Sequence, residues 1–68
     1  MRDVLRAPVQ VGLLAMPALN QLVNYGRSLG LDVDLHISGW LIRSGYVVAS
    51  GEPEAVRRFA AALELVAG

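Results

Sequence analysis

The fold is decided by the stretch from Gly39 to Gly51, GWLIRSGYVVASG, which runs directly into EPEAV at residues 52–56. Two runs rich in aromatic and β-branched residues flank Ser44-Gly45, a pair compatible with a two-residue turn, and this pattern predicts an antiparallel β-hairpin. In the segment that follows, Pro53 and the acidic residues beside it favour the first turn of a helix. The stretch therefore predicts two paired strands that pack beneath a C-terminal helix.

Hydrophobic periodicity predicts the remaining elements on both sides of this hairpin. The odd positions from Leu5 to Leu13 are apolar, which is the two-residue period of a half-buried strand. Because Pro8 cannot donate a ladder hydrogen bond, the strand either starts there or lies with that position on a sheet edge. Three- and four-residue spacing then predicts a helix from Pro17 to a stop at Gly30. Alternation resumes over residues 32–43, and residues 46–50 form the last strand. The apolar faces of the two helices are Leu19, Leu22, Val23, Gly26 and Leu29 in the first, and Val56, Phe59, Ala60, Leu63 and Val66 in the second.

The order β-α-β-β-α predicts the fold class α+β, with residues 1–68 as a single domain. A right-handed crossover with the hairpin folded back between its strands gives a three-stranded antiparallel sheet with strand three in the centre and both helices on one face. This is a truncated ferredoxin-like sandwich that lacks the last strand. Its first strand becomes a free edge, and free edges pair with other chains.

Composition narrows the classes of partner. The chain has no cysteine and no lysine, and six acidic and six basic residues cancel, so nothing attracts it to nucleic acid. The longest apolar run, Val9–Leu19, is about half of the roughly 20 residues that a spanning helix needs. Asp3 opposes a signal peptide at the N-terminus. We expect a cytoplasmic protein that binds neither membrane nor nucleic acid, and the 54% hydrophobic content predicts a surface that faces a partner.

The predicted hairpin pairing assigns side chains to the two faces of the sheet. Pairing of Arg43 with Tyr46 across the turn places Leu35, Ile37, Leu41, Tyr46 and Val48 beneath the helices. The opposite face then carries a polar end, with Asp32, Asp34, His36 and Ser38, and an apolar end, with Trp40, Ile42, Val47 and Ala49. We interpret the apolar end as the core of an interface. A bulge at Gly39 would reverse the phase between the two ends, and a lone Trp40 platform for stacking nucleic acid is a further alternative.

Asp32, Asp34 and His36 form the candidate ligand group. They lie on one side of one strand, about 7 Å apart pairwise, and two carboxylates plus an imidazole resemble part of a divalent-metal site. A single strand rarely closes a coordination sphere, and alternating polar residues are what any solvated strand shows. The alternatives left open are a metal or small ligand completed by a second copy, a pH-sensitive contact of His36, and a solvated face. No metal or cofactor is expected within one chain.

The sequence from Gly39 onward, with Gly39-Trp40, Tyr46-Val47-Val48 and Glu52-Pro53-Glu54, resembles the corresponding half of the acylphosphatase family, and Val9-Gln10-Val11-Gly12 is similar to that family's phosphate loop. The resemblance covers about half the chain and implies a ferredoxin-like sandwich. It also implies a loop arginine that holds phosphate and an asparagine that positions water. Leu14 stands at the arginine's place and Arg43 or Ser44 near the asparagine's, so both catalytic groups are missing.

The sequence therefore predicts a small self-associating module, a regulatory or scaffolding protein-interaction subunit that forms a homodimer and has no catalysis of its own. The alternative is a small-molecule-binding protein or an acylphosphatase-like hydrolase whose site forms between protomers, with contributions from His36, Asp34 and Arg43.

Overall fold

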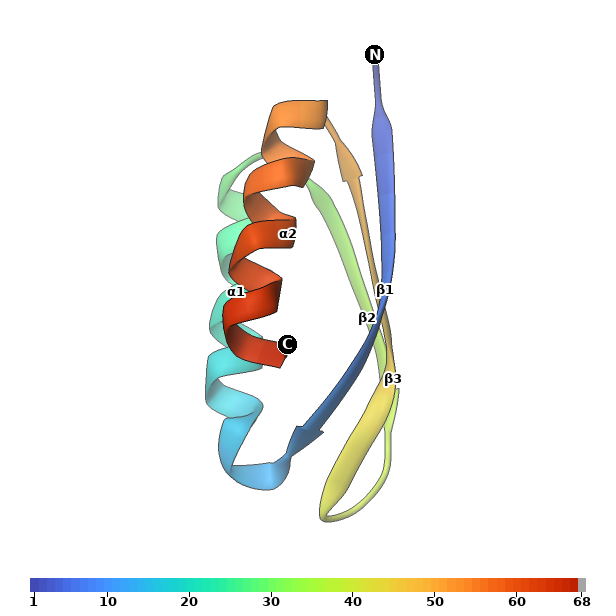
Figure 1. The fold of residues 1–68 in the computed structure, drawn as a ribbon, viewed down its shortest axis with the longest axis vertical. Helices are drawn as coiled ribbons and strands as arrows, with labels where there is room; N and C mark the ends of the chain where they lie inside the picture. The colour runs from blue at the N-terminus through green and yellow to red at the C-terminus, as the bar shows by residue number, and fades with distance from the viewer. Residues whose placement is uncertain (68) are drawn as a thin grey trace.

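The computed structural model describes residues 1–67 of the chain. Its elements follow in the order β1 (Asp3–Gly12), η1 (Leu13–Ala15), α1 (Met16–Ser28), β2 (Asp32–Ser38), β3 (Ile42–Gly51) and α2 (Pro53–Ala67). The strands form one antiparallel sheet in the order β1-β3-β2. Both helices cover one face of this sheet (Figure 1). The predicted α+β class, the central position of the third strand and the two helices on one face are confirmed.

The core lies between the helices and the side chains of the sheet that face them. Val9 and Val11 of β1 alternate with exposed neighbours, and Leu19 and Phe59 from the two helices are fully buried against the sheet. The buried hydrophobic residues of this core are Val9, Val11, Leu19, Leu22, Val23, Leu31, Val33, Val47, Ala49, Val56, Phe59 and Leu63. Six of the ten predicted apolar positions of the helices belong to it, and Leu29 and Val66 pack against it partly buried, because a stripe with helical spacing can meet the sheet along its whole length.

The predicted turn at Ser44-Gly45 is wrong. Ser44 pairs with Ser38 inside the ladder, and the chain reverses instead through Gly39–Leu41. Gly39 has φ +130°, a conformation that residues with a side chain rarely adopt, and this permits the reversal. Gly45 is required for a different reason: a side chain there would collide with the backbone carbonyl of His36 on the neighbouring strand. The glycine that marked a turn in the sequence is a position of close approach between strands.

The true register reverses the predicted faces of β3. It differs from the predicted pairing by an odd number of residues, and such a slip moves every side chain to the other side of a sheet. Val47 pairs with Leu35, is 1% exposed and lies beneath the helices, and Ala49 is 0% exposed. The placement of Val47 and Ala49 on an exposed interface was therefore wrong. Tyr46 and Val48, predicted to be covered by the helices, lie on the opposite face.

Candidate interaction surface

Large apolar side chains gather at one end of the molecule. They come from η1, which follows β1, and from the connection between β2 and β3, and both segments lie at the end opposite the N-terminus (Figure 1). The backbone N–H of Leu13 donates to the carbonyl of Leu41 at 3.0 Å, and Gly12 pairs with Ile42, so the two segments are joined. We call this surface the apolar tip. Its residues are Leu13, Leu14, Trp40, Leu41 and Ile42.

The apolar tip is the most exposed apolar surface that several neighbouring residues share. The exposed fractions are 55% for Leu13, 98% for Leu14, 85% for Trp40, 66% for Leu41 and 60% for Ile42. Because a large side chain presents on the order of 200 Å², the tip exposes roughly 700 Å² of mostly apolar surface. The largest such patch on a typical monomer is about 300–600 Å² and is often functional. Burial of the tip against a partner is therefore favoured.

A shallow hollow lies within the tip. Leu13, Gly39, Trp40 and Arg43 line a volume of about 270 Å³. The Nε of Arg43 is buried and has no hydrogen-bond partner among residues 1–67. A buried donor without a partner is costly. The hollow thus combines apolar walls with one cation.

The sheet face that the helices leave uncovered, here called the open face, is mostly polar. The guanidinium of Arg6 lies 4.2 Å from the centre of the Tyr46 ring, and the ring of His36 stacks on Tyr46 with centroids 4.8 Å apart. Arg2 forms a salt bridge of 3.0 Å with Asp32. The strand residues on this face are Val4, Arg6, Pro8, Gln10, Gly12, Asp32, Asp34, His36, Ser38, Ile42, Ser44, Tyr46, Val48 and Ser50, and Ile42 is the residue at which this face meets the apolar tip. The apolar end predicted for this face is therefore wrong for Val47 and Ala49, which lie beneath the helices.

Of the predicted interface residues, two remain available. Trp40 and Ile42 are exposed and belong to the apolar tip, although Trp40 lies in the loop between strands and not on a strand over the open face. Val47 and Ala49 belong to the core. The structure therefore separates residues that the sequence had placed on one surface.

Asp32, Asp34 and His36 do lie along the open face of β2, as predicted. The structure does not gather them further: Asp32 is engaged with Arg2 and His36 with Tyr46. Within the described part of the chain, no three histidine, cysteine or acidic residues form a group that could hold a metal ion. Their role as ligands completed by a second copy stays a prediction.

Sequence reasoning missed three of the five residues of the apolar tip, and one of them, Leu41, was predicted to lie beneath the helices. Leu13 was assigned to the first strand, and Leu14 was considered only as a substitute for a catalytic arginine. The available signal was the pair of leucines directly after Gly12, where the alternation of β1 ends. Two adjacent leucines cannot both face a core from a strand, so one of them at least must be exposed or leave the strand.

The chain matches no protein-family model, no curated protein and no solved structure. The resemblance to acylphosphatases therefore stays a prediction. Among the described residues, no helix has the length and apolar content needed to cross a membrane. The expectations of a cytoplasmic location and of no nucleic-acid partner also stay predictions.

Proposed function

We propose that this chain is a non-catalytic protein-interaction module, a regulatory or scaffolding subunit, that forms a homodimer by burying its apolar tip against that of a second copy. The observation that carries the proposal is the exposure of five large apolar residues on two segments that a backbone hydrogen bond joins. Trp40 and Ile42, the two predicted interface residues that remain exposed, belong to this group.

The area of the tip supports a dimer. Its roughly 700 Å² of exposed surface is close to the about 800 Å² that each partner buries in an interface of standard size. Tryptophan is among the residues that most often dominate binding energy, and Trp40 precedes Leu41 in the chain and lines the hollow together with Leu13. Arg43 is the one charged residue that lines the hollow, so the tip carries few charges that association must desolvate.

The shape of the molecule makes the arrangement specific. The protomer measures 38 × 17 × 16 Å, and the tip lies at one end of its long axis. Contact between two tips therefore produces an elongated dimer and leaves the open face and both sheet edges accessible. A dimer formed through the open face would be more compact, so the frictional ratio in sedimentation separates the two.

The experiment is analytical ultracentrifugation of the wild-type chain and of Trp40→Asp at high micromolar concentration. We expect an elongated wild-type dimer, and dissociation at least about thirtyfold easier in the variant, because a hot-spot residue contributes 2 kcal/mol or more. Far-UV circular dichroism should be unchanged, since Trp40 is exposed and outside the strands.

Leu65→Asp is the matched control, because Leu65 is equally exposed but lies on α2, outside the tip. This variant should dimerise like the wild type. A wild-type chain that sediments as a monomer throughout the concentration range, or a Leu65→Asp variant that dissociates as readily as Trp40→Asp, would count against the proposal.

A further inference from the structure

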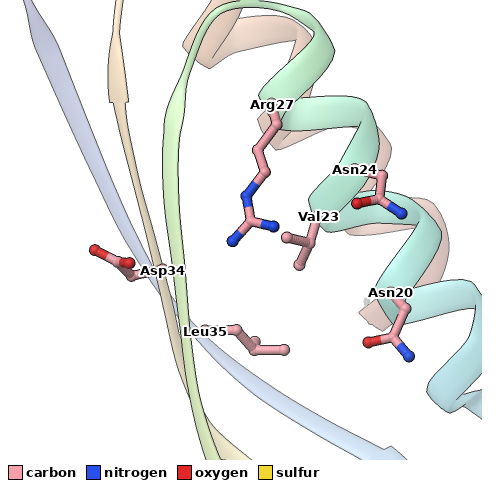
Figure 2. A pocket seen from close by; sticks show the side chains of 6 residues that line it. All are labelled: Asn20, Val23, Asn24, Arg27, Asp34 and Leu35. Carbon is pink, nitrogen blue, oxygen red and sulfur yellow. The ribbon is translucent and has the colours of Figure 1, made fainter.

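A groove of about 480 Å³ runs between α1 and the edge strand β2, outside the apolar tip (Figure 2). Four residues of α1 and two of β2 line it: Asn20, Val23, Asn24, Arg27, Asp34 and Leu35. Figure 2 shows that Leu35 projects from β2 toward the helix, whereas the carboxylate of Asp34 lies on the opposite side of the strand. The groove therefore has an apolar floor, two amides and one cation.

The backbone of β2 offers hydrogen bonds along this groove. Pro8 has no N–H, so its pair with Tyr46 cannot exchange hydrogen bonds, and the polar groups of Tyr46 must point toward its other partner, His36. Residues that point toward and away from the neighbouring strand alternate along an antiparallel ladder. Val33, Leu35 and Ile37 therefore direct their backbone N–H and C=O groups away from β3, toward the free edge of β2. The Val33 carbonyl agrees with this, because it accepts a hydrogen bond from Nη2 of Arg27 at 3.4 Å on the outer side.

The two edges of the sheet differ in their capacity to pair. On β1 the outward positions are the even ones, and Pro8 interrupts them with a missing donor. On β2 the outward positions Val33, Leu35 and Ile37 all carry an N–H group. Unprotected edges of this kind accept extended peptides as an additional strand. Strand addition is therefore favoured at β2 and opposed at β1.

The helix supplies side chains suited to a bound strand. Asn20, Asn24 and Arg27 are spaced by four and three residues, which places them on one face of α1 above the groove. The amides can both donate to and accept from a peptide backbone. In residues 1–67 the carboxylates that form salt bridges engage arginines other than Arg27, whose recorded contact is the Val33 carbonyl. Its guanidinium remains able to bind a carboxylate.

We propose that this groove binds an extended peptide that adds antiparallel to β2 and places a carboxylate on Arg27. The antiparallel direction is favoured because such pairing is slightly more stable per residue than parallel pairing. Arg27 lies beside Val33, near the beginning of β2, so the end of an antiparallel peptide that reaches it is the C-terminal end. The carboxylate is either the chain terminus or an acidic side chain close to it.

The probes are N-acetylated peptides of alternating threonine and valine, with a free C-terminal carboxylate, with a C-terminal amide, or with an amide and a final aspartate. Binding is followed by NMR titration of the backbone amides. We expect the acid to shift and protect the amides of Leu35 and Ile37 while the β1 amides stay unchanged. The plain amide should bind about tenfold more weakly, because it loses a charge-assisted hydrogen bond. If the peptide with a final aspartate binds as tightly as the acid, an acidic side chain can supply the carboxylate as well as the chain terminus can. If only the acid binds tightly, the chain terminus supplies it.

Arg27→Gln should weaken binding of the acid about tenfold and leave that of the amide unchanged. Arg57→Gln, which removes the same charge from the exposed face of α2, should change neither. The titrations are repeated with Trp40→Asp, which should bind the peptides as well as the wild type does. Failure of the proposed dimer and failure of the proposed peptide site can therefore be told apart. Three results would overturn the proposal. The first is a set of chemical-shift changes confined to the tip or the open face, and the second is equal binding of the acid by wild type and Arg27→Gln. The third is protection of the Leu35 and Ile37 amides without peptide, which a second copy paired with β2 would cause.

Discussion

The apolar tip and the open face are both left uncovered by the chain, yet they differ in how their side chains are satisfied. On the open face Arg6 and His36 contact Tyr46, and Arg2 pairs with Asp32. At the tip, Leu14 and Trp40 project almost entirely into solvent. Groups that partner one another, or that water can solvate, need no further cover, whereas exposed apolar area gains free energy when it is buried. Lack of cover alone therefore does not mark an interface, and the chemistry of the uncovered groups decides.

The largest effect should separate the two faces of β3. Val47→Asp should abolish folding, because it places a charge without a partner in a site that is 1% exposed. Val48→Asp, one residue away on the open face, should lower the free energy of unfolding by only about 1 kcal/mol through reduced β-propensity. Chemical denaturation followed by circular dichroism measures both.

A milder pair keeps this comparison measurable when Val47→Asp yields no folded protein. Val47→Thr should cost about 1–3 kcal/mol for a buried hydroxyl, and Val48→Thr should cost less, about 0.5 kcal/mol, at a half-buried position of the open face. Equal losses in the two threonine variants would show that the register of β3 is not the one described.

An intermediate effect should distinguish the tip from the open face in association. Leu14→Ser removes an almost fully exposed apolar side chain from the tip, and we expect the dimer to dissociate about tenfold more readily. Val4→Ser makes the same kind of change at an exposed position of the open face and should leave the dissociation constant unchanged. Sedimentation equilibrium gives both dissociation constants. A larger increase in the dissociation constant for Val4→Ser than for Leu14→Ser would show that the interface lies on the open face.

The smallest effect should come from the aromatic stack on the open face. Tyr46→Ala removes the contacts with Arg6 and His36, and we expect a loss of about 1 kcal/mol in unfolding free energy with no change in association. His36→Ala removes one of these contacts and should cost less. Thermal unfolding combined with sedimentation checks both variants, and a dissociated Tyr46→Ala chain would contradict the assignment of the interface to the tip.

The periodicity of apolar residues was enough to predict the two helices, each of which buries a single apolar face. The stripe of Leu19, Leu22 and Val23 and that of Val56, Phe59 and Leu63 predicted both helices and their buried sides, because a helix with one apolar side can bury only that side. The β-α-β-β-α order without a fourth strand likewise predicted the edge position of the first strand, and Pro8 is compatible with it because a missing donor is tolerated at a sheet edge.

The residues that form the candidate surfaces could not be predicted from periodicity in this way. Ser44-Gly45 has the composition of a turn, but Gly45 is needed for another reason. The carbonyl of His36 on the neighbouring strand leaves no room for a side chain at this position, and the sequence does not show that His36 lies there. One wrong turn then misplaced Val47 and Ala49. The groove beside Asn20, Asn24 and Arg27 also needs a helix and a strand edge to be brought together.

The sequence by itself determined the three strands, the two α-helices, the apolar faces of these helices and the alternation along each strand, because these depend on spacing between near neighbours. The tertiary structure alone decided the register of β3, and with it which half of that strand's residues the core takes. It also brought Leu13 and Leu14 beside Trp40 to form the tip. The physical reason is that register and surface clustering depend on contacts between residues far apart in the chain, which no local pattern encodes.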